Sequence, residues 1–370
     1  MPEGERLAQP SATLRSVPTS IDAARRLLQA MPKAELHLHL DGCLRPVTAI
    51  ELATARGVDA PSSYLGMFDV LVAAEHPGSQ AELLRSFALP IALMQDTDAL
   101  TRITTELVED KAADRVHYME IKWAPAIHRA LGLSLDEVVA TVASAASQAA
   151  KRLDVVVRLT VVGLRSDVVA SNIEVAEVGA RHRAAGVTGF DLAGFEGLHP
   201  DPSAQLAAFD AARAGGLGIT VHSGEVPDPA LVRGALTVKP SRIAHGAPAI
   251  DDPSLIAELI ARGITLDLCP TSNVQAGTVS TFADHPLARL VRQGVGITIN
   301  TDDTTISNVS LSEELLSCHV ELGLSLAEIW RCNLHALHAA FVEDDVRAAL
   351  LDSFRTWAAF VPELHETSSN

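Results

Sequence analysis

Histidine and acidic side chains stand close together at several points of this 370-residue chain, and their spacing could support metal chemistry. The first cluster lies in AELHLHLDG, residues 34–42, where apolar and polar side chains alternate with a period of two. This alternation is typical of a strand with one apolar face, and it puts His37, His39 and Asp41 on the same side. A strand with one face in solvent would show the same pattern. The stretch therefore needs support from the rest of the chain before it indicates a site.

Two further clusters could complete a metal site. His222 begins the stretch HSGE, and Asp302 is the first of the two aspartates in TDD. Together with His37 and His39 they offer three imidazoles and one carboxylate, a suitable donor set for zinc. With an open position for water such a site is catalytic, because bound zinc lowers the pKa of its water toward about 7. The sequence thus favours a catalytic rather than a structural zinc site.

Three more polar residues lie where they could handle protons at this site. Glu225 follows His222 by three residues and could deliver a proton. His245 could orient or deprotonate the water, and Asp303 could hydrogen-bond the attacking water beside Asp302. Each residue taken alone has a commoner interpretation, as a packed or surface histidine or as part of a turn. Only their joint placement favours a site.

Eight β-type runs alternate with helical patterns along the chain, and they have to position these clusters. Such alternation of apolar, β-branched runs with helices is typical of parallel strands covered on the outside, so we expect an α/β fold, a (β/α)8 TIM barrel. A doubly wound open sheet is the alternative. Additional helices are expected after the first strand and at the C-terminus. The predicted strands begin at Glu35, Val116, Asp154, Val187, Leu217, Ser241, Gly263 and Val295.

The polar clusters share one position relative to these strands. His39 and Asp41 end the first predicted strand, His222 the fifth, His245 the sixth and Asp302 the eighth. In a barrel the C-terminal ends of all strands meet at one mouth, where active sites are built. The shared position therefore predicts a single active site.

Composition limits the remaining possibilities. The chain is 48% hydrophobic and carries a net charge of −17, which argues against nucleic acid and anionic membranes as partners. Its four cysteines form no C-x-x-C motif, so reduced thiols in the cytoplasm are expected. The first twenty residues contain no apolar core of signal-peptide length, and no apolar run approaches membrane-spanning length. Residues 1–30 are predicted to be a partly disordered tail, and residues 31–370 a single domain.

At this point the chain resembles the adenosine and adenine deaminases of the metal-dependent amidohydrolase superfamily. The similar stretches occur in the family's order, and LCPTSNVQ and SNVSLSEE look more like the adenosine-type members. The resemblance implies a barrel with one zinc ion per chain. It also implies hydrolysis of adenosine, and of 2′-deoxyadenosine, to the inosine product and ammonia through attack of a zinc hydroxide on purine C6. The stretches are PKAELHLHLDG, FDLAGFE, TVHSGEV, RIAHG, LCPTSNV and INTDDTTISNVSLSEE.

The resemblance also implies a role for each matching residue. Glu225 is expected to protonate purine N1, while His245 and Asp303 orient and activate the water. Gly194 is expected to approach purine N3, and Asp41 to reach the ribose. The implied zinc ligands are His37, His39, His222 and Asp302, and the implied substrate-binding residues are His39, Asp41, Gly194 and Asp303.

Some positions depart from the family pattern and keep other readings open. Ser223 and Thr304 replace the common alanine and proline, and Leu83 and Leu84 stand where many members carry a phenylalanine. The alternatives are a deaminase of adenine or of a 5′-modified adenosine, and a non-catalytic purine-binding relative. A binuclear hydrolase is disfavoured because no lysine ends the middle strands TVVGL and FDLAG. The expected partner is a small purine nucleoside.

Overall fold

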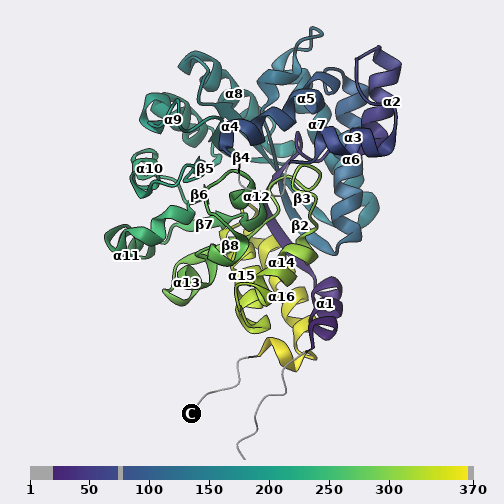
Figure 1. The fold of residues 1–370 in the computed structure, drawn as a ribbon. Helices are drawn as coiled ribbons and strands as arrows, with labels where there is room; N and C mark the ends of the chain where they lie inside the picture. Colours follow the sequence, from purple (N-terminus) through teal and green to yellow (C-terminus); the bar gives the residue numbers. More distant parts are fainter. Residues whose placement is uncertain (1–19, 74–77, 366–370) are drawn as a thin grey trace, which may run out of the picture.

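The computed structural model describes residues 20–73 and 78–365, and within them eight parallel strands form a sheet in the order β1 to β8 (Figure 1). Each strand overlaps one of the eight predicted runs. The strands are β1 (Lys33–His39), β2 (Val116–Trp123), β3 (Val156–Leu164), β4 (Val187–Ala193), β5 (Gly218–Ser223), β6 (Arg242–His245), β7 (Thr265–Leu268) and β8 (Gly296–Ile299).

The sheet closes on itself where the segment after β8 meets β1. Asp302 N–H donates to the carbonyl of His37 at 3.1 Å, and His39 N–H donates to the carbonyl of Asp302 at 2.7 Å. A parallel bridge between Leu38 and Asp302 lies at the same place. The fold is therefore the expected (β/α)8 TIM barrel, and the alternative of an open sheet is wrong.

The first strand is buried on both faces. Leu36 and Leu38 are fully buried, and so is His37 between them. The alternation seen in the sequence thus separates two buried environments, and the solvated-face interpretation of this strand is wrong. Glu35 is held by a buried ion pair with Lys111 at 2.7 Å, which offsets the cost of burying its charge.

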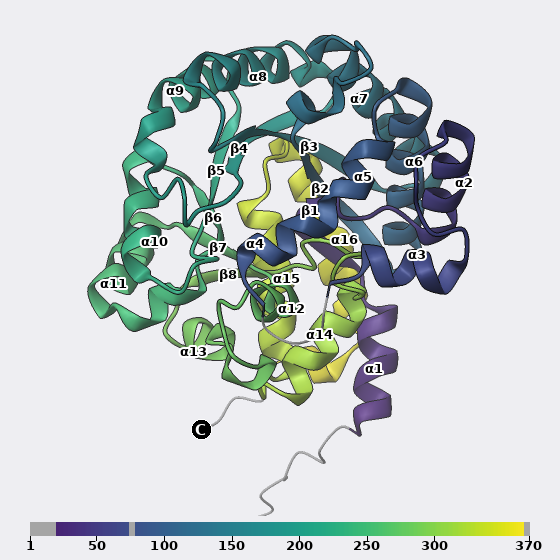
Figure 2. The same cartoon turned by 45° about the horizontal axis from the view of Figure 1, so that its top comes forward.

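Helices surround the barrel on its outer side (Figures 1 and 2). Most follow a strand, as a βα repeat requires. They are α6 (Thr97–Ala113), α7 (Leu135–Leu153), α8 (Val169–Arg181), α9 (Leu206–Ala214), α10 (Pro229–Ala235), α11 (Pro253–Arg262), α13 (Leu287–Arg292) and α15 (Leu326–Ala339).

The expected additional helices are present after β1 and toward the C-terminus. Figure 2 shows α4 lying across the barrel among the strand ends, so this inserted segment covers the mouth. The inserted helices are α2 (Pro46–Arg56), α3 (Tyr64–Leu71), α4 (Gln80–Leu83) and α5 (Ala88–Leu93). The others are α12 (Pro270–Gln275) after β7, and α14 (Leu311–Val320) and α16 (Asp344–Ala358) near the C-terminus.

The last third of the predicted N-terminal tail is helical. Residues 21–30 form helix α1 (Ile21–Ala30), which Ser20 caps by accepting from Ala23 N–H at 3.2 Å. Ala24 and Leu28 are fully buried because they lie four residues apart on one helix face that packs on α14. Residues 1–19 of the predicted tail lie outside the described residues. In the described ranges, no helix is long and apolar enough to cross a membrane.

Candidate active site

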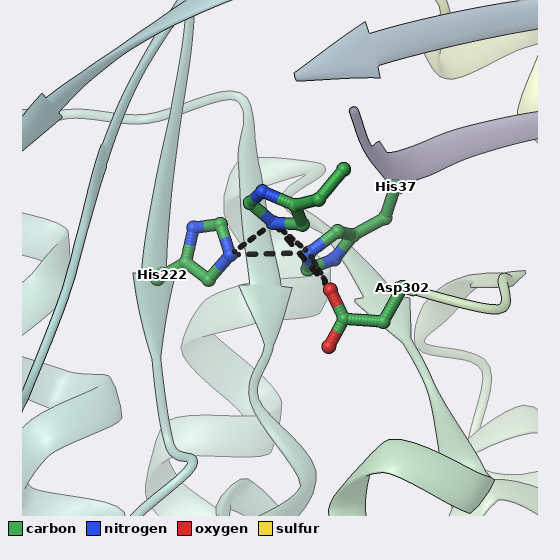
Figure 3. A group of neighbouring side chains, drawn as sticks. His37, His222 and Asp302 are labelled. Carbon is green, nitrogen blue, oxygen red and sulfur yellow. Dashed lines mark hydrogen bonds and ion pairs between the residues drawn. The ribbon is translucent and has the colours of Figure 1, made fainter. Parts of the chain in front are cut away.

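Four potential metal ligands converge at the mouth of the barrel. The Nε2 atoms of His37, His39 and His222 lie 3.0–3.2 Å from one another. Asp302 Oδ1 lies 3.0 Å from His37 Nε2 and 3.4 Å from His39 Nε2 (Figure 3). Ligand atoms about 2.0–2.1 Å from a zinc ion at tetrahedral angles are roughly 3.3 Å apart. The four atoms are therefore spaced as ligands of one tetrahedral ion.

The protonation of these groups suits metal binding. Burial lowers the pKa of His37 well below its ordinary value and that of His39 to about 4, so both imidazoles are neutral with a free lone pair. Burial alone would raise the pKa of Asp302, but the neighbouring histidines His37, His245 and His39 together outweigh it and hold that pKa well below the usual range. Asp302 is therefore a carboxylate.

Neighbouring polar groups hold two of these ligands in place. His222 Nδ1 lies 3.0 Å from Asp191 Oδ2, which is 2.8 Å from the Nζ atom of Lys122. The second carboxylate oxygen of Asp302 accepts from Ser272 Oγ at 2.7 Å. Such contacts fix the tautomer of a histidine ligand and the orientation of a carboxylate ligand.

Glu225 lies beside the cluster in a buried position. Burial raises the pKa of Glu225 well above its ordinary value, and the charges of Asp302 and Glu196 raise it further. The side chain of Gln80, on α4, donates to Glu225 Oε2 at 2.6 Å, and its Oε1 accepts from Glu196 N–H at 3.0 Å. A carboxyl group that keeps its proton near neutral pH can act as a general acid.

Asp303 packs against the glycine that ends the first motif. A Cβ atom built on Gly42 would lie 1.7 Å from Asp303 Oδ1, so only glycine fits there. Burial raises the pKa of Asp303 well above its usual range, and the nearby carboxylate of Asp302 adds to the effect. The glycine after HLHLD thus leaves room for the second aspartate of TDD.

His245 lies at the end of β6 with its Nε2 atom 3.7 Å from Asp302 Oδ2 and 3.8 Å from Glu225 Oε1. Burial lowers the pKa of His245 to about 3, so the ring is neutral. His245 and Asp302 both have left-handed backbones, with φ of 68° and 62°. Such strained non-glycine conformations are concentrated at functional sites.

The remaining predicted residues also reach the mouth. Gly194 follows β4 with a φ of 108°, a conformation that favours glycine. Asp41 Oδ1 lies 2.8 Å from Nε2 of His128, a contact that the sequence analysis did not anticipate. This partner, His128, is not one of the four candidate metal ligands.

These groups border a cavity of about 230 Å³. Every predicted site residue except His37 lines it, so the structure brings the whole set together. In the described part of the chain, no lysine or arginine contributes to its walls. Its apolar walls are Leu83, Leu84, Phe87, Ile91, Ala124, Ile127, Val162, Leu164 and Ala193.

The family departures have local explanations. Ser223 Oγ donates to Glu196 Oε1 at 2.6 Å, which an alanine could not do. Leu83 and Phe87 both line the cavity, so apolar contact is kept where the common phenylalanine is missing. Thr304 N–H lies 3.4 Å from the sulfur of Cys43. Sequence reasoning missed Gln80 and His128, since neither belongs to a motif and both meet their partners across long sequence separations.

Comparison with known proteins gives a consistent family. Residues 32–357 match the sequence model of the family described as adenosine deaminase. The chain is 36% identical over 356 residues to an adenosine deaminase of Mycolicibacterium vanbaalenii, covering 91% of this chain and 96% of that protein.

Two crystal structures are also similar. An amidohydrolase from Burkholderia ambifaria with bound zinc is 26% identical with a TM-score of 0.84, covering 95% of this chain and 96% of that one. The N6-mAMP deaminase of Arabidopsis thaliana is 30% identical with a TM-score of 0.80, covering 90% and 99%.

Proposed function

Because the chain belongs to the adenosine deaminase family of hydrolytic enzymes, we propose that it converts adenosine to inosine and 2′-deoxyadenosine to 2′-deoxyinosine, releasing ammonia in both cases. One observation carries the proposal. A buried carboxyl group with a raised pKa, Glu225, lies beside four ligand atoms that are spaced for one metal ion. Removal of the 6-amino group of a purine requires a proton at N1 and a nucleophile at C6, and this pairing offers both.

We propose zinc as the metal, held by His37, His39, His222 and Asp302. Three imidazoles and a carboxylate suit zinc, and the similar protein from Burkholderia ambifaria contains it. When bound, zinc supplies a hydroxide nucleophile at neutral pH. A second possible group, His245, Cys269 and Asp302, shares Asp302 with the first. Burial raises the pKa of the Cys269 thiol well above its usual range, so this group is a poor metal site and one ion per chain is expected.

The other residues act on the substrate and the attacking water. Glu225 donates its proton to purine N1, while His245 and Asp303 orient and activate the attacking water. Gly194 approaches purine N3 through its backbone and Asp41 faces the ribose, while His39 borders the substrate as well as holding the metal. The positions of these groups around one cavity support the assignment.

The charges of the cavity favour a nucleoside over a nucleotide. Asp302, Asp303 and Asp41 are acidic, and no cationic side chain among the described residues that line the cavity could pair with a phosphate. The chain resembles an N6-mAMP deaminase in fold, but its cavity lacks the charge that an AMP would need. Asp41 offers an acceptor for a sugar hydroxyl, which favours a nucleoside over free adenine.

The domain boundary and the compartment are part of the same proposal. We take residues 31–370 as one deaminase domain, with α1 packed on its C-terminal part. The four cysteines are buried free thiols, which supports a reducing compartment such as the cytoplasm.

A substrate panel tests the proposal. Purified enzyme is given adenosine, 2′-deoxyadenosine, adenine, AMP and a 5′-modified adenosine, and ammonia release is followed. The two nucleosides should have the highest kcat/KM, with AMP and adenine far lower. Preference for AMP or adenine would overturn the substrate assignment, and absence of ammonia release from all of them would overturn the activity.

Two variants test the assigned roles. Glu225→Gln keeps the shape but removes the transferable proton, so kcat should fall by roughly 10²–10⁴-fold while zinc stays bound. His222→Ala should remove both zinc and activity. Metal analysis that finds two zinc ions per chain would contradict the mononuclear assignment.

A further inference from the structure

His245 lies nearest the cavity in a row of three buried side chains that leads away from it. Its Nδ1 atom lies 3.1 Å from Asn273 Nδ2, and Asn273 Oδ1 lies 3.1 Å from Nε2 of His285. At the far end, the backbone N–H of Leu287 meets Nδ1 of His285 at 3.2 Å. Asn273 is fully buried and His285 is 4% exposed, so water does not replace these contacts.

The backbone end of this row sets the direction of every hydrogen bond in it. A peptide N–H can only donate, so Nδ1 of His285 accepts from Leu287. Burial lowers the pKa of His285 to about 3, and a neutral ring that accepts at Nδ1 carries its hydrogen at Nε2. That hydrogen is donated to Asn273 Oδ1, which leaves the amide nitrogen of Asn273 to donate to His245 Nδ1.

The consequence for His245 is a fixed tautomer. Because its Nδ1 accepts from Asn273, the neutral ring carries its hydrogen at Nε2, on the side of the cavity. Nε2 has no hydrogen-bond partner in the described part of the chain. It lies 3.7 Å from Asp302 Oδ2 and 3.8 Å from Glu225 Oε1, which is too far for a direct bond. The N–H is therefore available to an oxygen atom bound in the cavity.

We propose that Asn273 and His285 are positioning residues that hold His245 in its Nε2–H tautomer, so that His245 donates a hydrogen bond to the attacking oxygen and does not act as its base. This inference rests on the proposed deamination and deepens it, because it decides between the two roles that sequence reasoning left open for His245. A donor already aimed at developing negative charge stabilises a transition state without reorganising.

The first test is spectroscopic and does not depend on the substrate. The zinc-loaded enzyme is labelled with ¹⁵N-histidine, and the His245 signals are assigned by their absence in His245→Gln. We expect a protonated-type Nε2 and an acceptor-type Nδ1. The reverse assignment in the wild-type protein would overturn the proposal, whatever the variants do and whatever the substrate proves to be.

The second test reverses the direction of the hydrogen bond between residue 273 and His245. Asn273→Asp keeps the shape but turns the donor toward His245 into an acceptor, so the hydrogen of His245 should move to Nδ1. We expect the two ¹⁵N assignments to exchange and kcat to fall by about 10²–10³-fold, the range for losing one aimed donor, with KM and zinc content little changed. If the tautomer of His245 is exchanged and kcat does not change, the claim that its Nε2–H contributes to catalysis is refuted.

A control variant separates the effect of the His245 tautomer from the effect of a general loss of stability. Asn333→Asp alters another buried amide, which accepts from Ala34 N–H and donates to the Pro32 carbonyl outside the cavity. It should lower the melting temperature without changing the His245 signals or kcat.

In His245→Gln the amide N–H can replace the ring donor, so this variant should keep clearly more activity than His245→Ala. Equal loss in both would indicate a base and contradict the proposal.

Discussion

Asp41 Oδ1 lies 2.8 Å from Nε2 of His128, whose other ring nitrogen is 2.9 Å from the carbonyl of Met94. The histidine is fully buried, so the carboxylate is fixed from behind while it borders the cavity. A side chain anchored in this way has lost its rotamer freedom before a ligand arrives, which lowers the entropic cost of binding. This arrangement suits the proposed contact with a ribose hydroxyl.

Asp41→Ala should weaken the binding of adenosine but leave zinc in place. The expected rise in KM corresponds to about 1.5–3 kcal/mol, the contribution of a charge-assisted hydrogen bond. Steady-state kinetics with adenosine and with free adenine check this, since any residual activity on adenine should hardly change. A parallel loss of zinc would show that Asp41 supports the metal site instead.

Gln80→Met should reduce kcat by roughly 5- to 10-fold, because it removes a hydrogen bond of about 1 kcal/mol that orients Glu225. Methionine has a similar length and keeps the apolar part of the side chain. Arg85→Ala, an exposed change on the same inserted segment, serves as the control and should leave kcat as in the wild type. If both variants behave alike in adenosine turnover, the contact between Gln80 and Glu225 has no catalytic role.

Gly42→Ala should displace Asp303, because the new Cβ would overlap its carboxylate. We expect kcat to fall by at least about 10²-fold and unfolding free energy by roughly 1–3 kcal/mol, as for an overpacked core. Zinc analysis should still find the metal. Gly234→Ala is the matched control, since nothing lies within 4 Å of its added Cβ, and it should fold and turn over normally. Wild-type kinetics in Gly42→Ala would contradict the packing described for Asp303.

Glu314 predicts a pH dependence of stability that lies outside the active site. Burial raises its pKa to about 7 from the ordinary value of 4.5, although Thr271 donates to it through its backbone N–H at 2.8 Å. Below pH 4.5 both folded and unfolded states hold the proton. Between pH 4.5 and 7 only the folded state holds it, so stability falls as pH rises, by about 3 kcal/mol in total.

Glu314→Gln removes this ionisation. Its melting temperature should therefore fall less between pH 5 and pH 8 than that of the wild type, as measured by circular dichroism. The same fall in both proteins would show that Glu314 does not ionise across this range. Because the residue lies on α14, away from the cavity, kcat serves as an internal control and should not change.

The barrel could be predicted from the sequence because its strands carry local signals. Runs such as VHYMEIKW and VVRLTVVGL are apolar and rich in β-branched or aromatic residues, and each cluster of polar residues ends such a run. The rule that parallel strand ends meet at one mouth then brought His37, His222 and Asp302 together without any knowledge of distances. Helix α1 was missed because its buried face consists of only Ala24 and Leu28, which are too few positions to show a helical period.

The contacts that refine the site could not be predicted in this way. Gln80 meets Glu225 across 145 residues, and His128 meets Asp41 across 87 residues. Neither position has a periodic pattern or a motif, and both depend on how the inserted helices and the loop after β2 settle over the mouth. Likewise, the hydrogen-bonded row from His245 to Leu287 could be recognised only from the hydrogen bonds of the structure.

The closure of the barrel between β1 and Asp302 has a consequence for how the protein folds during its synthesis. His37 and His39 leave the ribosome early, but the carboxylate that completes their set is added more than two hundred residues later. Until then β1 has an unpaired edge, because its second neighbour is the segment at Asp302. A prematurely ended chain would therefore lack the fourth ligand and expose a strand that can pair with another molecule. Completion of the metal site and protection from aggregation are thus reached in the same late step of folding.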